Sequence, residues 1–380
     1  MGGGVKVLVT GAKGFIGSNL VVALGRAGAD VVQVDVDLPS SAMVSAVRGA
    51  EVIYHLAGVN RPTQENEFEP GNVGSLKALL AAVDQATLTE SEQAPPVIVL
   101  SSSTQASQDT GYGRSKLSAE QVLEFHASRT GSAAVIYRLP GVFGKWCRPN
   151  YNSVVATFCH NVARDLPIEI SDPNRVVELV YVDDVVRHFM THLASSPAGV
   201  FRAAVKPTFS VRLGELAAHI RGFRASRNTL EAADASDPFL RRLLATFTSY
   251  LELQDLSHSL EQWTDARGAL AELLKSPRAG QIFLSRTRPG ITRGNHYHDT
   301  KVEKFFVVEG EGVIRFRPLG GKVVTEYRVS GRDFKVVDIP PGVTHSIENV
   351  GNGDMIVLFW SSEIFDPEHP DTYPSDVLPR

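Results

Sequence analysis

A tyrosine and a lysine four residues apart, Tyr112 and Lys116, lie in a helical pattern that runs to about Arg129. On a helix this spacing places both side chains on one face. A Tyr hydroxyl has a reference pKa of about 10, and a nearby ammonium lowers it, which makes the proton easier to transfer near neutrality. The apolar run Val97–Leu100 predicts a buried strand that ends in serines at 101–103, where a hydroxyl could hold a substrate oxygen. These groups meet the needs of an alcohol/ketone redox site, although the Tyr–Lys spacing alone is a weak signal.

The elements that must position this site begin near the N-terminus. Residues 5–9 form an apolar run that predicts a buried strand, followed by a glycine-rich turn and a helical pattern to about Ala27. In the turn, Gly11 permits the tight bend, Gly14 lets the backbone approach a pyrophosphate, and Gly17 allows close packing of helix on strand. The helix N-terminus adds free N–H groups for the phosphates. The stretch therefore predicts a dinucleotide-binding turn.

An acidic residue, Asp35, ends the next predicted strand about 20 residues beyond the glycines. A carboxylate there can bind the adenosine ribose hydroxyls, which favours NAD, and it would repel the 2′-phosphate of NADP unless a nearby cation compensates. No Arg follows directly, and both cofactors stay open. The third predicted strand runs through Leu56 and Ala57 to Gly58, small residues that let a flat ring approach the backbone. Strands and helices alternate up to Arg138, which predicts a doubly wound parallel sheet with ligands at the carboxyl ends of its strands.

A second set of reactive residues lies far downstream. From about Asp265, helical patterns give way to short runs rich in Val, Ile and Phe with Gly and Pro turns, which predicts an all-β barrel or jelly roll. Within it, His296 and His298 alternate along one strand and so point to one face, where Glu303 and His345 on neighbouring strands can meet them. Three imidazoles and one carboxylate suit a divalent ion such as Zn²⁺, with substrate or water completing the shell.

The composition is that of an ordinary soluble globular protein. The chain has 380 residues, 43% of them hydrophobic, and a formal net charge of −4. This length allows two domains, which we expect at residues 1–250 and 251–380. There is no basic excess to indicate nucleic acid, no signal peptide is visible, and no apolar run approaches the roughly 18–20 residues of a membrane-spanning helix. The only cysteines, Cys147 and Cys159, indicate reduced thiols and a cytoplasmic location.

Several motifs together resemble the extended short-chain dehydrogenase/reductase family over roughly the first two-thirds of the chain. They are Thr10-Gly11-x-x-Gly14-x-x-Gly17, the serine ending the fourth strand, Tyr112-x-x-x-Lys116, and the segments 55–58, 138–144 and 180–185. Members act mostly on nucleotide sugars. The resemblance implies catalytic roles for Ser103, Tyr112 and Lys116, with Ser102 the less favoured serine. The cofactor contacts that it implies are Gly11, Gly14, Phe15, Ile16, Gly17, Asp35, Leu56, Ala57 and Lys116.

The loop after the last sheet strand meets the sugar nucleotide in that family. Here Arg148 could contact phosphate and Asn152 could hydrogen-bond the sugar or diphosphate, although a plain polar loop explains both residues equally well. The 4,6-dehydratases of the family carry an Asp-Glu pair directly after the serine, whereas Thr104-Gln105-Ala106 stands here. Dehydration is therefore disfavoured, and ketone reduction or 4-epimerisation remains.

The metal motif resembles the cupin pattern. Its first half, residues 290–310, fits fully, whereas in the second half Phe334 stands where a Gly usually precedes Pro340, which predicts an altered turn. A reductase joined to a cupin, with the segments 55–62, 293–298 and 359–360, closely resembles the bifunctional capsular-polysaccharide enzymes over nearly the whole chain. In that family the cupin domain epimerises C3 of UDP-2-acetamido-2,6-dideoxy-L-hexos-4-ulose. The reductase domain then reduces C4 with NADPH, on the route to UDP-N-acetyl-L-fucosamine.

The resemblance implies NADPH, with NADH as an alternative, a Zn²⁺ or other divalent ion, and a UDP-linked 4-keto-6-deoxy amino sugar as substrate. By position, Tyr297, Lys301 and Lys304 are candidates for the base that exchanges the C3 proton. Barrel strands of this kind often pair between subunits, so a homodimer is expected, without nucleic-acid or membrane partners. Two other functions stay open: a 4-epimerase that retains NAD and carries a structural cupin, and a sugar-nucleotide-binding regulator whose metal only stabilises the fold.

Overall fold

The computed structural model describes residues 4–89, 94–194 and 199–378. The chain divides into two compact units: residues 1–221 with 242–251, and residues 222–241 with 252–380. None of the helices formed by the described residues is long and apolar enough to cross a membrane.

The first unit is built on a six-stranded parallel sheet with the strand order β2-β1-β3-β4-β5-β8. Its strands are β1 Lys6–Thr10, β2 Asp30–Val34, β3 Val52–His55, β4 Val97–Ser103, β5 Ala134–Leu139 and β8 Val200–Ala203. Because β2 and β3 lie on opposite sides of β1, the strand order reverses at β1, and a crevice for ligands opens there at the carboxyl ends. The predicted Rossmann-type sheet is confirmed.

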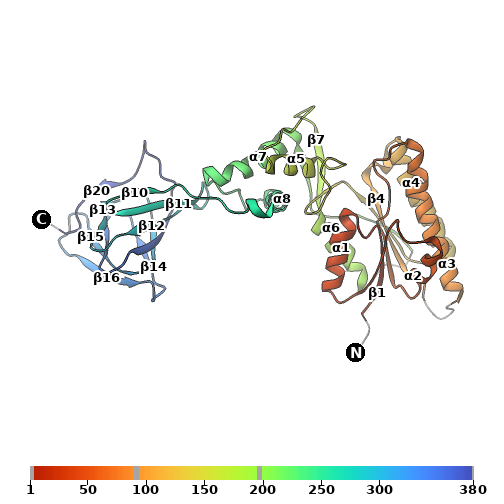
Figure 1. Cartoon of the computed structure of the whole chain (residues 1–380), viewed down its shortest axis with the longest axis horizontal. Helices are drawn as coiled ribbons and strands as arrows, with labels where there is room; N and C mark the ends of the chain where they lie inside the picture. The colour runs from red at the N-terminus through yellow and green to blue at the C-terminus, as the bar shows by residue number, and fades with distance from the viewer. Residues whose placement is uncertain (1–3, 90–93, 195–198, 379–380) are drawn as a thin grey trace. The chain divides into compact units, whose positions relative to one another are not determined.

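Helices cover both faces of this sheet (Figure 1). They are α1 Phe15–Arg26, α2 Ser40–Val47, α3 Ser75–Thr89, α4 Gly111–Thr130 and α6 Val182–Met190. On one face, Leu8 and Ile98 pack against Leu79 and Leu123 from α3 and α4. On the other, the strands pack against α1 and α6. Buried on both faces, the strands must be apolar throughout, which is why β1 and β4 contain continuous Val/Ile/Leu runs.

Smaller elements complete the first unit and lead to the second. The small sheet has the order β6-β7-β9, with strands β6 Gly141–Phe143, β7 Val176–Tyr181 and β9 Thr208–Arg212. The accompanying helices are α5 Val154–Ala163, α7 Leu213–Thr229 and α8 Pro238–Thr248. The stretch Gly222–Arg241, which includes the end of α7 and the start of α8, belongs to the second unit.

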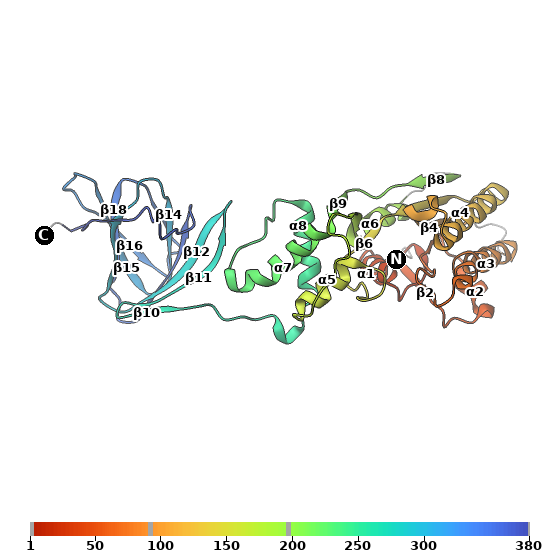
Figure 2. The same ribbon diagram turned by 90° about the horizontal axis from the view of Figure 1, so that it is seen from above.

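The rest of the second unit is all-β, as predicted. Figure 2 shows strands of this part, among them β11, β12 and β14. One sheet has the order β10-β11-β12-β19-β14-β17 and the other β16-β15-β18-β13-β20. The strands are β10 Trp263–Asp265, β11 Gly268–Ser276, β12 Gly280–Thr287, β13 Thr292–Tyr297, β14 Glu303–Glu309, β15 Glu311–Pro318, β16 Thr325–Ser330, β17 Val336–Ile339, β18 Val343–Asn349, β19 Met355–Ser361 and β20 Tyr373–Pro374. Apolar side chains from both sheets, among them Phe305, Ile314 and Val357, form the core between them. This is the two-sheet architecture of a jelly roll.

Candidate functional site

A cavity of ≈ 1070 Å³ lies at the carboxyl ends of the parallel strands. Its lining includes the glycine turn, the residues after β3, the end of β4, the start of α4, the loop after β6 and the stretch from residue 169 into β7. Tyr112, Lys116 and Ser103 all face this cavity, as do Gly11, Gly14, Phe15, Ile16, Gly17 and Leu56. The fold thus brings the redox residues predicted from sequence next to the predicted dinucleotide turn.

The glycine turn is tight for steric reasons. Gly11 has a left-handed φ of +66°, and a Cβ there would lie 2.8 Å from the backbone nitrogen of Ala57. A Cβ on Gly17 would lie 2.1 Å from the carbonyl oxygen of Gly11, so helix α1 could not start so close to β1 with any other residue. The backbone of Ala57 packs against the turn at Gly11, and the Ala57 N–H donates to the Thr10 hydroxyl at 3.3 Å.

Asp35 lies beside an adjoining hollow, together with Lys13 and Asp37. Its carboxylate accepts hydrogen bonds from the backbone N–H of Lys13, at 2.8 Å, and of Val36, at 2.9 Å. The Lys13 ammonium is exposed, borders both the hollow and the large cavity, and pairs with Asp37 at 2.6 Å. The sequence shows no Arg directly after Asp35, and the structure places the Lys13 ammonium near this carboxylate. Lys13 directly precedes Gly14 of the glycine turn, and this position in the sequence could have identified it as a cation near Asp35.

The start of α4 orients Tyr112 and Lys116. The Thr110 hydroxyl caps the helix by accepting the N–H of Gly113 at 3.0 Å, and one turn later the Lys116 ammonium donates to the carbonyl of Ser101 at 2.8 Å. Burial of Lys116 lowers its pKa to about 8. Burial raises the pKa of Tyr112, and a hydrogen bond with the Ser103 hydroxyl opposes that rise. The pKa of Tyr112 therefore moves opposite to the sequence expectation, because desolvation penalises the phenolate more than its neighbours favour it.

The neighbouring serine has a different partner. Ser102 donates its hydroxyl to the carboxylate of Glu120, which is fully buried and forms a two-pronged ion pair with Arg138. The Ser102 hydroxyl is thus engaged with Glu120, although Ser102 also lines the cavity, and the Ser103 hydroxyl is the one that bonds Tyr112. This geometry supports the choice of Ser103 over Ser102.

The substrate residues inferred from the sequence line the same cavity. Arg148 and Asn152 line it together with Trp146 and Tyr151, and the Arg148 guanidinium lies over the Tyr151 ring, 5.3 Å from its centroid. Arg175, just before β7, also lines the cavity. Sequence reasoning missed it because no motif surrounds it. A cavity lined by arginines as well as by a dinucleotide turn can accept a second phosphorylated ligand.

The second candidate site lies inside the all-β unit. One ligand atom from each of His296, His298, Glu303 and His345 lies within 4.8 Å of the others. A bulge in β13 helps to create this arrangement: Asn295, with φ of +57°, interrupts the register so that His296 pairs directly with His345 on β18. His298, Glu303 and His345 are buried, and His296 is half-buried.

The donor set fits a divalent cation. Nε2 of His298 and Nε2 of His345 are buried without a hydrogen-bond partner, although each lies within 3.5 Å of the same Glu303 oxygen. Burial would raise the pKa of Glu303, but the adjacent imidazoles lower it to about 2, so this carboxylate is ionised. Burial lowers the pKa of His296 to about 4, which leaves it neutral. Buried imidazole nitrogens without partners around one carboxylate are what a bound ion would satisfy.

The three candidate bases are not placed as the sequence predicted. The Tyr297 ring stacks on Tyr373, with centroids 5.2 Å apart, on the side of β13 away from the histidines. Lys304 is exposed and pairs with Asp338. Lys301 is buried near the site, but its ammonium donates to the carbonyl of Pro370 at 2.9 Å. Alternation along a strand explains the first two outcomes, because neighbours of inward-facing ligands point outward.

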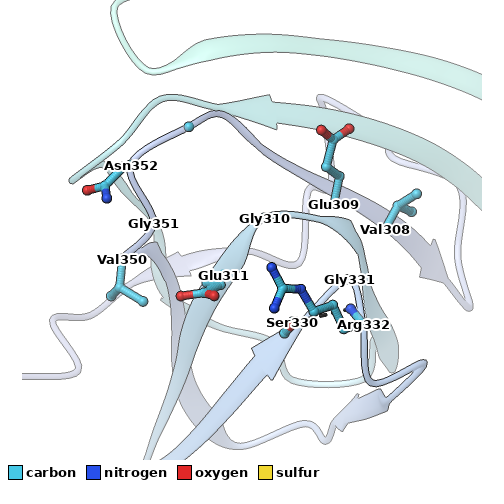
Figure 3. Close-up of a pocket in the computed structure, with 11 residues that line it drawn as sticks. Val308, Glu309, Gly310, Glu311, Ser330, Gly331, Arg332, Val350, Gly351 and Asn352 are labelled. Atoms are coloured by element: carbon cyan, nitrogen blue, oxygen red, sulfur yellow. Dashed lines mark hydrogen bonds between the residues drawn. The ribbon is translucent and has the colours of Figure 1, made fainter.

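Another hollow opens at the opposite end of the strands that carry Glu303 and His345 (Figure 3). Turn residues line it, with the side chains of Glu309 and Arg332 among them. The metal-ligand cluster is not part of its lining.

Comparison with known proteins agrees with both halves of the structure. Residues 7–203 match the NAD dependent epimerase/dehydratase family, and residues 263–373 match the polysaccharide biosynthesis C-terminal domain. The chain is 41% identical over 374 residues to UDP-2-acetamido-2,6-beta-L-arabino-hexul-4-ose reductase of Pseudomonas aeruginosa (strain PA103), covering 98% of this chain and 99% of that protein.

Solved structures give the same result. The capsular polysaccharide assembling protein CapF from Staphylococcus aureus is 43% identical and superposes with a TM-score of 0.89, covering 98% of this chain and 100% of that one. MoeE5 in complex with UDP-glucose and NAD is 24% identical, with a TM-score of 0.51 over 57% of this chain and 81% of that one, which shows the fold alone. The chain therefore belongs to the NAD dependent epimerase/dehydratase family, within the group of capsular-polysaccharide enzymes that carry a C-terminal polysaccharide-biosynthesis domain.

Proposed function

We propose that this chain is a bifunctional UDP-sugar enzyme. Its all-β unit, a metal-binding cupin, epimerises C3 of UDP-2-acetamido-2,6-dideoxy-L-hexos-4-ulose, and its parallel-sheet unit then reduces the C4 ketone with NADPH. The observation that carries the proposal is the group of Tyr112, Lys116 and Ser103 in one cavity with the dinucleotide turn, without an acid–base pair after the serine. The 41% identical relative, whose name describes a reductase of a UDP-linked ketosugar, supports it.

The reductase residues have separable tasks. The nicotinamide cofactor, when bound, supplies the hydride to C4. Ser103 donates a hydrogen bond to the ketone oxygen, and Tyr112 gives that oxygen its proton. Burial keeps Tyr112 protonated at neutral pH, which suits a proton donor in the direction of reduction. Lys116, charged below its pKa of about 8, holds the donor and the nicotinamide ribose in place.

The metal unit would act on the hydrogen beside the ketone. His296, His298, Glu303 and His345 would hold the ion. Bound there, a divalent ion would polarise the 4-keto group and so acidify the C3 hydrogen. The half-buried His296 marks the more open side of the cluster, where substrate can approach. The base that exchanges the proton is not among Tyr297 and Lys304, whose side chains are engaged elsewhere.

The preference for NADPH would depend on Lys13. Replacing Lys13 with alanine should raise KM for NADPH several-fold, because the 2′-phosphate would lose an exposed cation beside Asp35, and should leave KM for NADH unchanged. Steady-state kinetics with both cofactors measures this ratio. Asp37→Asn is the matched control: it frees the Lys13 ammonium from its ion pair and should not weaken NADPH binding. An unchanged NADPH/NADH ratio in K13A would remove Lys13 from cofactor selection.

We expect deprotonation of Lys116 to produce the alkaline limb in the pH profile of reductase kcat/KM. Because burial lowers its pKa to about 8, the lysine is charged below that pH and loses its proton above it. Reductase kcat/KM, which reports pKa values of the free enzyme, should be level up to pH about 8 and then fall. Arginine stays protonated throughout this pH range. The Lys116→Arg enzyme should therefore be slower than wild type, but its kcat/KM should not fall above pH about 8. A wild-type profile that stays level well beyond pH 8 would contradict this assignment.

The experiment that tests the proposed function supplies a UDP-linked 4-ketosugar with NADPH and follows both cofactor oxidation and deuterium uptake at C3. A 4-epimerase that retains NAD would give turnover without net NADPH consumption, and a binding regulator would give no turnover at all. We further propose the domain boundary near residue 250, a homodimer, Zn²⁺ as the ion and the cytoplasm as the location. Measurement of the protein's size in solution tests the homodimer, and metal analysis of the purified protein tests Zn²⁺ as the ion.

A further inference from the structure

The segment after β19, residues 362–378, is tied to the metal end of the all-β unit at several points. The N–H of Phe365 donates to the Gln281 side chain at 2.8 Å, and the N–H of Ser375 donates to the carbonyl of Asn295 at 2.9 Å. Val377 is fully buried, and Arg317 donates to its carbonyl at 3.1 Å. The segment is therefore part of the packed unit, and its path past the histidines is fixed at both ends.

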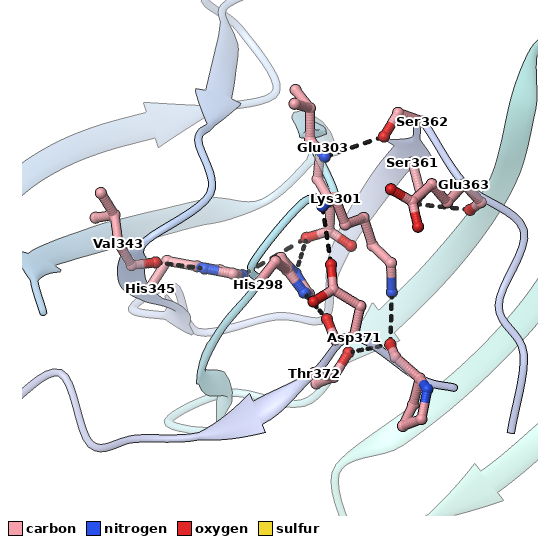
Figure 4. A network of polar contacts seen from close by, with 12 residues as sticks. His298, Lys301, Glu303, Val343, His345, Ser361, Ser362, Glu363, Asp371 and Thr372 are labelled. Carbon is pink, nitrogen blue, oxygen red and sulfur yellow. Dashed lines mark hydrogen bonds and ion pairs between the residues drawn. The ribbon is translucent and has the colours of Figure 1, made fainter. Parts of the chain in front are cut away.

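Asp371 lies where this segment crosses the metal ligands (Figure 4). Its carboxylate accepts hydrogen bonds from three successive backbone N–H groups, at 2.8 Å from Asp299, 3.1 Å from Thr300 and 2.8 Å from Lys301. These three residues form the turn between the ligands His298 and Glu303. Asp371 adopts a left-handed φ of +40°, a costly conformation for a residue with a Cβ that the surrounding contacts must enforce.

The main chain of the same residue contacts a ligand directly. The carbonyl oxygen of Asp371 lies 2.5 Å from Nδ1 of His298. A carbonyl only accepts, so Nδ1 must carry the proton, and in the neutral ring Nε2 then holds the free lone pair. That Nε2 is the buried, unpartnered atom 3.3 Å from the Glu303 carboxylate. The matching contact of His345 comes from Val343 on its own strand and is longer, at 3.3 Å.

We propose that Asp371 is a positioning residue for the metal ligand His298. Its carbonyl fixes the ring so that Nε2 faces the cluster, and its carboxylate holds the turn that sets the spacing of His298 and Glu303. The C-terminal segment thereby completes a site whose ligands all lie earlier in the chain. This inference rests on the proposed metal site. Contacts that hold a ligating histidine by its second nitrogen commonly contribute tenfold to hundredfold to metal affinity, which sets the expected effect.

The test compares metal binding by full-length wild type, Asp371→Ala, Asp371→Gly and Asp366→Ala. Asp371→Gly keeps the left-handed backbone accessible while it removes the carboxylate, so it separates loss of the anchor from added backbone strain. Asp366 is the matched control, because its carboxylate is exposed and, among the described residues, its hydrogen bonds are with Glu368 and His369 of its own segment. The probes are Zn²⁺ affinity by competition with a chelator and the visible spectrum of Co²⁺-loaded protein, which reports ligand geometry.

Both Asp371 variants should bind Zn²⁺ about 10- to 100-fold more weakly and show an altered Co²⁺ spectrum, while D366A matches wild type. The circular-dichroism spectrum of the metal-free full-length chain and the thermal unfolding of its all-β unit should match wild type in all the variants, which verifies that the unit carrying Asp371 is folded. Wild-type affinity and spectrum in D371G would overturn the positioning role and leave the metal site standing. Failure of wild type itself to bind either ion would instead overturn the proposed metal site.

Discussion

Tyr112→Phe should lower the rate of ketosugar reduction by about 10²- to 10⁴-fold, the usual contribution of a positioned general acid. The substitution removes one oxygen and leaves the ring, which packs against Phe68 with centroids 5.8 Å apart. NADPH and the UDP-sugar should therefore bind as before, and the loss should be in kcat. Single-turnover oxidation of NADPH, followed by absorbance, measures the step directly. The pKa of Tyr112, raised by burial, means that wild type carries this proton throughout the neutral range.

A tyrosine in the other unit supplies the control. Tyr327 is exposed on β16, distant in sequence from the reductase residues. Tyr327→Phe also removes one phenolic oxygen, but the rate of ketone reduction should not change. Deuterium uptake at C3 should persist in Y112F, because the metal ligands are intact. If Y112F reduced the ketone at more than a tenth of the wild-type rate, the proton would have to come from another group, and the central role of this residue would be wrong.

His296→Ala should abolish C3 exchange and lower metal affinity by at least the 10- to 100-fold typical of a residue that only supports a ligand. His296 is the least buried of the four ligands, so its truncation leaves the smallest void in the unit. The reductase residues lie in the first unit and are untouched. A ketosugar that already has the inverted C3 should therefore still oxidise NADPH at the wild-type rate. Mass spectrometry of recovered substrate in deuterated water, with metal analysis of the protein, measures both effects.

His369→Ala is the control for this loss. His369 is exposed and pairs only with Asp366 of its own segment among the described contacts, so metal content and C3 exchange should match wild type. C3 exchange at the wild-type rate in metal-depleted H296A would show that the ion has no part in the epimerisation.

Local chemistry made much of both sites predictable. Gly11 and Gly17 are required at their positions because backbone atoms would lie within 3 Å of any Cβ added there. Only glycine fits such positions, so the turn can be recognised from the sequence. The helical spacing of Tyr112 and Lys116 likewise follows from fixed geometry. His296 and His298, two residues apart, come together at the cluster although β13 ends at Tyr297 and His298 lies just beyond it. In each case the residues that form the site are close in sequence or carried by a repeating element.

Effects that depend on distant packing were not predictable. The direction of the pKa shift of Tyr112 depends on how deeply the fold buries it, and Asp371 reaches its histidine from 73 residues downstream. Strand β13, Thr292–Tyr297, contains no alternating apolar residues. Strand β11 contains good helix formers such as Ala269 and Leu273. Both segments form strands because they pair with neighbouring strands, which local sequence does not reveal. Phe334 adopts a left-handed φ of +46°, a backbone conformation that favours glycine, so only the fold reveals that this position needs it.

The most direct test of the account is one reaction of wild-type enzyme with NADPH and the UDP-linked 4-ketosugar in deuterated water. We predict a C4-reduced product with inverted C3 that carries deuterium at C3, with one NADPH consumed per product. Deuterium enters C3 only if the proton there is exchanged before the ketone is reduced. A reduced product that retains hydrogen and the original configuration at C3 would contradict the coupling of the two sites.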